Sequence, residues 1–465
     1  MRPLEMALVV ALGLTQCAFA LAGRTGATWA GTVVVVTGVV AVAQVGVEGW
    51  RWQMLPAELL TGALVLAWAW QRGADAEAGV GRPGMVIGVV TLGLAIALPT
   101  ALPVFRLPTP TGPDAIGTLT YHWVDAARGE EFTDDQTDRR EVMVQIWYPA
   151  QPQPVAPRAP YVEDPAVLEP LARLLHLPDF MLSHLRYITT NAVQAAPIAD
   201  KDGVYPVLIF SHGRGGYRQH NTLEIEELAS HGYIVAAIDH PYAASGVIYP
   251  DGRRAIFDPR MTERAFVDGK IPYLAQDALF VLQQLTALDQ ADPRGVLTGR
   301  LDLTRVGIFG LSLGGEIATE ACTLEPRLRA CLAMDVWMPA DVIAKGLQQP
   351  TLWITRDEAT MRLEGWKETD VRETWETMRA VFERMPGDGY FVQIPGMFHQ
   401  DFSDAALLSP LTRPLGLTGP IDSDRAHAIV NAYTLAFFDR YLKDQPAPLL
   451  AEPSPEYPEV LFERR

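Results

Sequence analysis

The stretch Gly310-Leu311-Ser312-Leu313-Gly314 decides the fold of this 465-residue chain. It follows the apolar run Val306-Gly307-Ile308-Phe309 and leads into a helix-compatible segment, Gly315 to Ala321. A serine with glycines two residues to either side, between a strand and a helix, is typical of a nucleophile elbow, in which the glycines permit a strained turn that presents the hydroxyl. We therefore expect Ser312 to be a catalytic nucleophile; a glycine-rich structural turn is the alternative.

Apolar runs of strand length alternate with amphipathic segments on both sides of this elbow. The predicted strands cover residues 118–124, 142–147, 207–210, 233–238, 330–334, 351–355 and 390–394, and the predicted helices cover 222–230 and 273–288. Continuous apolar strands separated by helices indicate an α/β hydrolase fold, with a mostly parallel sheet and helices on both faces. Residues 160–191 have leucines at helical spacing around Pro178, which suits either a small cap beside a pocket or surface helices.

A serine hydroxyl is a weak nucleophile, so it needs an imidazole to take its proton and a carboxylate to orient that imidazole. On this fold the chain order is serine, acid, histidine. His399 is the best base because it follows the last predicted strand, whereas its rival His427 lies inside an amphipathic segment. Asp335 and Asp357 each end a strand after Ser312, and position alone favours neither. The histidines that precede the serine, in the wrong order for this fold, are His212, His220, His231 and His240.

The transition state of ester cleavage also needs donors for a developing oxyanion. The glycine-rich stretch Phe210 to Gly216 follows a buried strand, and its glycines allow backbone N–H groups to face the site. We expect the donors to be the backbone N–H groups of Arg214 and Leu313. Side chains beside the presumed acid and base are candidate walls of an acyl pocket, or ordinary core: Trp337, Met338, Met397 and Phe398.

Four apolar stretches before residue 107 are each close to the length that crosses a bilayer core. They run approximately over residues 6–22, 28–47, 50–70 and 85–105. We expect residues 1–106 to form a four-helix transmembrane domain, residues 107–116 a proline-rich linker, and residues 117–465 the hydrolase domain. A cleaved signal peptide is the competing interpretation of the first stretch. Glu58, near the start of the third, either marks a function or reaches back to the headgroups.

The chain has a net charge of −17, and the part beyond these stretches carries −18, because the first 106 residues hold six Arg against five Asp and Glu. Such a surface argues against nucleic acid as a partner and against docking onto anionic headgroups by charge. Arginines divide evenly between the two sides of the four stretches, so the side of the membrane that the hydrolase domain faces is not predicted. Cys322 and Cys331 imply no disulfide framework.

Several segments resemble the platelet-activating factor acetylhydrolase family, calcium-independent esterases that remove short or oxidised sn-2 acyl chains from phospholipids. The similar segments are Phe210 to Arg218, Ala229 to Ala237, the elbow, Asp335 to Met338, and His399 to Phe402. The resemblance implies that the acid is Asp335 rather than Asp357, because that family places it on the strand after the nucleophile helix. It implies neither a metal ion nor an organic cofactor. Arg214, Leu311 and the apolar stretches depart from the family, which leaves substrate preference open.

We expect a multi-pass protein of a bacterial inner membrane that hydrolyses carboxylic esters of lipids through an acyl-enzyme. One alternative is a general short-chain or dienelactone-type carboxylesterase, for which the apolar stretches serve only as an anchor. Another, of a different class, is a membrane sensor or scaffold whose hydrolase fold only binds a ligand. Protein partners and oligomeric state are not predicted.

Overall fold

The computed structural model describes residues 1–21, 27–73, 82–199 and 203–465 and divides into two compact units. The first unit contains Met1–Phe105 together with two short later segments, Phe180–Tyr187 and Leu408–Leu411. The second unit contains Arg106–Asp179, Ile188–Leu407 and Thr412–Arg465.

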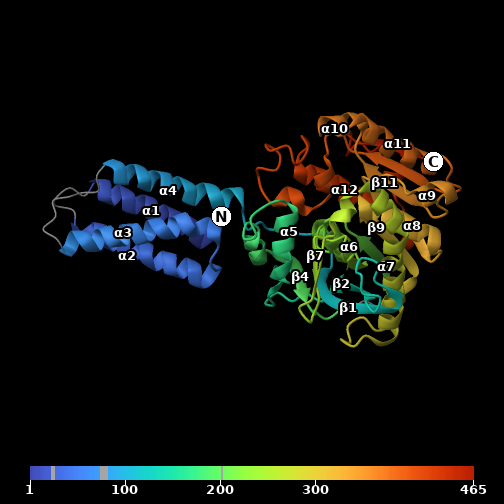
Figure 1. Ribbon diagram of the computed structural model, residues 1–465, viewed down its shortest axis with the longest axis horizontal. Coiled ribbons are helices and arrows are strands. Elements are labelled where there is room, and N and C mark those ends of the chain that lie inside the picture. Colours follow the sequence, from blue (N-terminus) through green and yellow to red (C-terminus); the bar gives the residue numbers. More distant parts are fainter. Residues whose placement is uncertain (22–26, 74–81, 200–202) are drawn as a thin grey trace. The chain divides into compact units, whose positions relative to one another are not determined.

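The first unit is built on four helices that run alongside one another (Figure 1). They are α1 (Pro3–Leu21), α2 (Ala27–Ala43), α3 (Leu55–Gly73) and α4 (Arg82–Ala101), with a π-helical turn at Gln44–Glu48 and a 3₁₀ turn at Trp52–Met54. Their shared core includes Leu8, Leu12, Met54, Ala57, Leu60 and Ala95. Each of the four expected stretches therefore contains a helix.

Among the described residues, three helices are long and apolar enough to cross a membrane, over Pro3–Ala20, Ala30–Glu48 and Arg82–Ala101. Helix α3, which carries Glu58 and Arg72 near its ends, is not one of them. Its Glu58 carboxylate accepts a hydrogen bond from the indole nitrogen of Trp50, at 2.8 Å.

The second unit is organised around an eleven-stranded sheet in the order β13-β12-β11-β10-β9-β5-β6-β2-β1-β4-β3. Its strands are β1 (Ala115–Gly129), β2 (Arg139–Ala150), β3 (Arg158–Pro160), β4 (Thr189–Gln194), β5 (Tyr205–Ser211), β6 (Ile234–Asp239), β9 (Leu301–Leu311), β10 (Leu328–Met334), β11 (Thr351–Thr355), β12 (Gly389–Gln393) and β13 (Leu461–Arg464). The six central strands from β6 to β12 pair in parallel, and β2 and β13 flank them in the antiparallel sense. A separate hairpin pairs β7 (Gly246–Ile248) with β8 (Arg254–Ile256).

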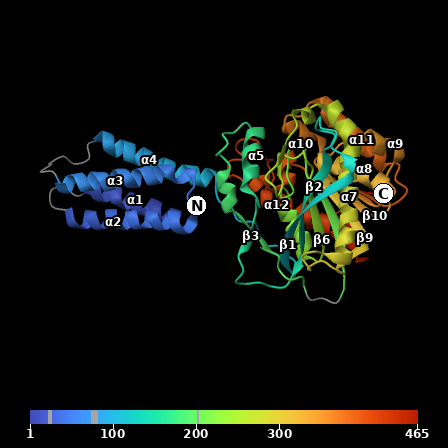
Figure 2. The ribbon, with the colours of Figure 1, turned by 60° about the horizontal axis from the view of Figure 1, so that its bottom comes forward.

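Helices cover both faces of this sheet, as Figures 1 and 2 show. The helices of this unit are α5 (Leu168–Leu174), α6 (Thr222–Ser230), α7 (Arg264–Ala291), α8 (Leu313–Leu324), α9 (Ala340–Lys345), α10 (Glu358–Leu363), α11 (Glu368–Phe382) and α12 (Ser423–Leu442). Along β5, Val207 and Ile209 join a core with α7, α8 and α11, whereas Leu208 and Phe210 join a core with α6 and α12. The predicted mostly parallel sheet with helices on both faces is confirmed.

Several boundaries differ from those predicted; β1 and β2, for example, extend at both ends beyond the predicted 118–124 and 142–147. Helix α7 begins at Arg264, nine residues before the predicted start, and contains Pro272. The stretch 160–191, predicted as a cap or as surface helices, holds α5 but also the start of β4, a short strand that lies between β1 and the edge strand β3. Short strands contain few buried side chains, so they leave a weak pattern in the sequence.

Candidate active site

The carboxyl ends of the parallel strands lie at one edge of the sheet, and the residues that follow them form the candidate site. Ser312 follows β9, Asp335 follows β10, Arg356 follows β11, and His399 comes shortly after β12. Strands β9, β10, β11 and β12 are consecutive neighbours in the sheet, so residues that are up to 87 positions apart in the chain lie at the same edge.

Ser312 has the strained backbone of a nucleophile elbow, with φ 54° and ψ −125° between β9 and α8. The two flanking glycines are required by close backbone approaches. A Cβ atom on Gly310 would lie 2.2 Å from the backbone of Gly314, and one on Gly314 would lie 1.9 Å from the carbonyl oxygen of Ser211. The turn therefore packs directly against the stretch that was expected to supply the oxyanion hole.

Asp335 and His399 form a close pair, with Nδ1 of His399 donating to Oδ2 of Asp335 at 2.5 Å. The other carboxylate oxygen accepts hydrogen bonds from the Thr355 hydroxyl at 3.0 Å and from Nε of Arg356 at 3.1 Å. Burial alone would raise the pKa of Asp335, but the charge of Arg356 and the bond to His399 hold it well below its usual range. The acid is therefore ionised, and Nε2 of His399 is left to take a proton.

The remaining triad contact, between serine and histidine, is not formed in this structure. Among the described residues, no hydrogen bond joins the Ser312 hydroxyl to His399. Hydrogen bonds of this kind are often long without substrate and tighten when it binds.

The rival acid and base have structural partners instead. The Asp357 carboxylate caps α10 by accepting a hydrogen bond from the backbone N–H of Thr360, at 3.1 Å. Nε2 of His427 lies 3.1 Å from the carbonyl oxygen of Ser403. Among the described residues, no cluster of His, Cys, Asp and Glu has the arrangement of a metal site.

The expected oxyanion loop lies against the nucleophile, because a Cβ atom on Gly213 would sit 3.5 Å from Cβ of Ser312. The carbonyl oxygen of Gly213 accepts bonds from the backbone N–H of Gly216 at 2.9 Å and from Nδ1 of His212 at 2.7 Å. In a trans peptide the C=O and the following N–H point in opposite directions. Fixing that carbonyl therefore also fixes the N–H of Arg214, one of the two expected donors. The other, the N–H of Leu313, is at the first position of α8, where helices leave amides without internal acceptors.

Sequence reasoning missed the role of His212, which it set aside on chain order alone. The ring is fully buried, and burial keeps its pKa well below the ordinary value, so it is neutral and carries one N–H. Its Nε2 accepts a hydrogen bond from the backbone N–H of His240, at 3.1 Å, which leaves the proton on Nδ1 for Gly213. The tautomer is thus set by the partners of the ring.

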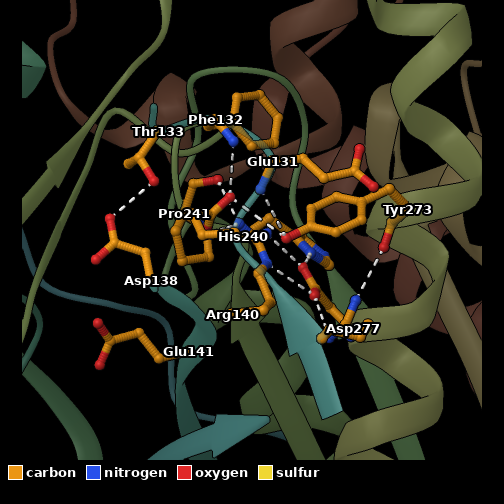
Figure 3. A network of polar contacts seen from close by, with 12 residues as sticks. Glu131, Phe132, Thr133, Asp138, Arg140, Glu141, His240, Pro241, Tyr273 and Asp277 are labelled. Atoms are coloured by element: carbon orange, nitrogen blue, oxygen red, sulfur yellow. Dashed lines mark hydrogen bonds and ion pairs between the residues drawn. The ribbon is translucent and has the colours of Figure 1, made fainter. Parts of the chain in front are cut away.

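A buried ionic network includes Arg140, His240 and Asp277 (Figure 3), and His240 connects it to His212 through the backbone hydrogen bond described above. His240 places Nδ1 2.9 Å from the Asp277 carboxylate and Nε2 3.1 Å from the Ser211 hydroxyl. Asp277 is paired with Arg140 at 2.6 Å and with Arg128 at 2.8 Å. Ser211, His240 and Asp277 have the connectivity of a catalytic triad, yet their exposure is at most 1%, so no substrate can reach them. They support the expected oxyanion loop from inside.

The four expected pocket residues differ in their surroundings, and Met397 is buried in the core with α6 and α12. Met338 is buried in the core with α8 and α11, and Phe398 is buried directly before His399. Trp337 is partly exposed, and the guanidinium of Arg264 stacks on its ring at 4.2 Å. Of the four, Trp337 is the one that is not buried.

Comparison with known proteins shows the family of this chain. The family described as platelet-activating factor acetylhydrolase, isoform II, matches residues 101–250 and 286–447. A platelet-activating factor acetylhydrolase of Gallus gallus is 23% identical over 73% of this chain and 84% of its own length. A probable 1-alkyl-2-acetylglycerophosphocholine esterase of Arthroderma benhamiae is 24% identical over 81% of this chain and 98% of its own.

A solved structure is also similar to this chain. The ferulic acid esterase from Streptomyces cinnamoneus superposes with a TM-score of 0.64 and 31% identity, over 77% of this chain and 99% of its own. These relatives are all esterases, and the shared fold is the α/β hydrolase fold. The chain is accordingly a hydrolase of ester bonds and belongs to the platelet-activating factor acetylhydrolase isoform II family.

Proposed function

We propose that the protein is a membrane-anchored serine esterase that cleaves carboxylic esters of lipids. The observation that supports it best is the ionised Asp335 held against Nδ1 of His399, at the same sheet edge as the strained Ser312. An oriented imidazole beside an elbow serine is the arrangement that acyl transfer requires.

In the proposed mechanism, Ser312 attacks the ester carbonyl while Nε2 of His399 takes the hydroxyl proton. Asp335 stabilises the imidazolium that forms, and the N–H groups of Arg214 and Leu313 bind the oxyanion. His399 then gives the proton to the leaving alcohol, which produces an acyl-enzyme. Water, activated by the same histidine, hydrolyses the acyl-enzyme and regenerates Ser312.

Lipid substrates are favoured by two independent observations. The curated relatives carry names of enzymes that act on an ether phospholipid. The helices of the first unit also expose large apolar side chains, among them Val36, Val39, Leu66, Val86 and Val89. Such side chains face outward on helices that lie in lipid rather than in water.

Labelling with a fluorophosphonate probe tests the serine mechanism without knowledge of the substrate. The full-length protein in detergent should react at a single site, and Ser312→Ala should abolish the reaction. Labelling that persists in Ser312→Ala would contradict the assignment of the nucleophile. No labelling of the wild type would favour a protein whose hydrolase fold only binds a ligand.

A general carboxylesterase is the second candidate, because the solved ferulic acid esterase covers 77% of this chain at 31% identity. Hydrolysis of a short-acyl phospholipid in vesicles should be compared with hydrolysis of a p-nitrophenyl ester in solution. The lipid proposal expects turnover of both, and use of the p-nitrophenyl ester alone would contradict it.

A further inference from the structure

Arg356 lies behind the proposed triad, at the end of β11, in a position that the sequence analysis did not single out. Its side chain is fully buried. Nε donates to one oxygen of Asp335 at 3.1 Å, and Nη2 lies 3.0 Å from the other, the oxygen that also accepts from His399. The Asp335 carboxylate is therefore shared between a permanent cation and the proposed base.

Glu364 and Trp366, which follow α10 in the chain, hold Arg356 in place. Nη1 forms an ion pair with the carboxylate of Glu364, whose other oxygen accepts a hydrogen bond from the backbone N–H of His399, at 3.2 Å. The ring of Trp366 lies 4.2 Å from the guanidinium carbon, and its centroid is 5.9 Å from that of the His399 ring. Arg356, Glu364 and Trp366 thus form one packed group that contacts both Asp335 and His399.

The charges around this group act on His399 in opposite directions. The cation of Arg356 disfavours a second positive charge on the imidazole, whereas the anion of Glu364 favours it. The other ionisable groups nearby are His220, whose pKa burial lowers to about 4, Asp401, whose pKa burial raises, and His427, whose pKa burial lowers. Among the described residues, Arg356 is the only Arg or Lys side chain that contacts Asp335.

We propose that Arg356 is a positioning residue of the triad which, through Asp335, sets the acidic limit of the range in which His399 acts as a base. It fixes the carboxylate by contacting both oxygens, and its charge keeps the imidazole available as a base in more acidic solution. This inference rests on the proposed function, because it needs the Ser312, His399 and Asp335 triad to be catalytic.

The test measures the second-order rate of fluorophosphonate labelling of the full-length protein against pH. The acidic limb of this profile is the range in which the labelling rate falls as the pH decreases. In Arg356→Gln it should move to higher pH by about 1 unit, because a cation in contact with Asp335, the partner of His399, is lost. In Arg356→Lys, which keeps the charge but not the planar contact, the limb should stay within about 0.3 unit of wild type while the plateau rate falls. In Glu364→Gln the limb should move the other way, to lower pH.

Arg362→Gln is the matched control. Arg362 lies on α10, six residues after Arg356, with its side chain 45% exposed and paired with Glu358 and Glu368. Its replacement by Gln changes the net charge of the protein by the same amount as Arg356→Gln. Solvent screens such a charge, and the limb should move by less than about 0.2 unit.

The outcomes separate this inference from the function on which it rests. No labelling of the wild type at any pH contradicts the proposed function itself. Normal labelling with an unmoved acidic limb in Arg356→Gln, or shifts of the same sign in Arg356→Gln and Glu364→Gln, overturns the role of Arg356. If Arg356→Gln shows no thermal unfolding transition and is therefore not folded, Glu364→Gln, which retains the Arg356 cation, decides alone. An acidic limb of Glu364→Gln at the same pH as wild type, or at higher pH, then overturns the inference.

Discussion

At the residue scale, the two candidate acids differ in what their carboxylates contact. Asp335 contacts His399, Thr355 and Arg356, whereas Asp357 contacts a helix backbone. Both end a buried strand, so their sequence surroundings are nearly equivalent. Position therefore could not choose between them, and only the resemblance favoured Asp335. In the structure it is Asp335, after the strand β10 that neighbours the nucleophile strand β9, that contacts the imidazole.

Substitution of the two acids should separate their roles. Asp335→Asn is expected to reduce the plateau rate of fluorophosphonate labelling by roughly 10³-fold, because the amide no longer holds the correct tautomer of His399. Asp357→Asn should leave the rate within about twofold and cost less than about 1 kcal/mol of stability, since asparagine also caps helices. Equal losses in the two variants would contradict the assignment of Asp335.

The hydrogen bond from His212 to Gly213 predicts an effect on turnover without direct substrate contact. In His212→Ala the Gly213 carbonyl loses its side-chain donor, so the N–H of Arg214 is held less firmly toward the oxyanion. We expect kcat for a p-nitrophenyl ester to fall by about 10- to 100-fold, somewhat less than for loss of an oxyanion donor itself, with little change in KM.

His427→Ala is the control for that experiment, because this ring bonds only to the Ser403 carbonyl among the described contacts. It should retain kcat within about twofold. A large increase in KM with unchanged kcat in His212→Ala would argue against orientation of the oxyanion donor.

At the element scale, helix α8 contains an ionisable group whose burial makes stability depend on pH. Glu316, one turn after Ser312, is 1% exposed, and burial raises its pKa to about 8. In the unfolded chain it loses its proton near pH 4.5, so between about pH 4.5 and 8 the folded state binds the extra proton and stability falls as pH rises. Above pH 8 both states are ionised and the dependence from this group ends.

Glu316→Gln should remove this dependence because the amide is neutral throughout. The variant is expected to gain stability over wild type by about 2 kcal/mol at pH 8 and by much less at pH 5. Denaturant unfolding at the two pH values measures the difference. A gain of equal size at both would show that the carboxyl group is not protonated in the folded state.

The elements themselves could be predicted well wherever burial was continuous. Strand β11 and helix α6 have the predicted limits, Thr351–Thr355 and Thr222–Ser230, because uninterrupted apolar runs and amphipathic spacing are local signals. The network of Asp277, His240 and Arg140 could not be predicted, since its members are 37 and 137 positions apart and meet only when the sheet forms. The role of Arg356 could not be predicted either, because in the sequence it is one of several charged residues in a polar segment after a strand.

At the scale of the whole molecule, the membrane proposal predicts behaviour on fractionation. The full-length protein should remain in the membrane pellet after alkaline carbonate and be released by detergent, because three helices have the length and apolarity of spans. Release by carbonate alone would contradict integral insertion and favour a peripheral protein.

The first unit also contains a buried ion pair whose energetics can be tested in the full-length protein. Arg51 and Glu5 are both fully buried, with Nη2 and Oε2 2.6 Å apart. Arg51→Met alone should destabilise the first unit by up to about 3 kcal/mol, because the buried Glu5 carboxylate then keeps only Arg2 as an ionic partner. The double variant Arg51→Met with Glu5→Gln should recover part of that loss, as measured by thermal unfolding in detergent. A double variant no more stable than Arg51→Met would argue against the pairing.

The chain returns twice to the first unit after leaving it. In Phe180–Tyr187 the ring of Phe180 packs edge-on against Trp52 at 5.4 Å, and in Leu408–Leu411 the Ser409 hydroxyl donates to the carbonyl of Ala101 at 2.6 Å. An anchor simply appended to an enzyme by gene fusion would have needed no such returns. Truncation before Arg106 would therefore remove the packing partners of two loops, and a fragment made that way should lose the contact of the half-exposed Phe180 with Trp52 and aggregate more readily. The protein should therefore be expressed, and compared with its relatives, as the intact polypeptide rather than without its first 105 residues.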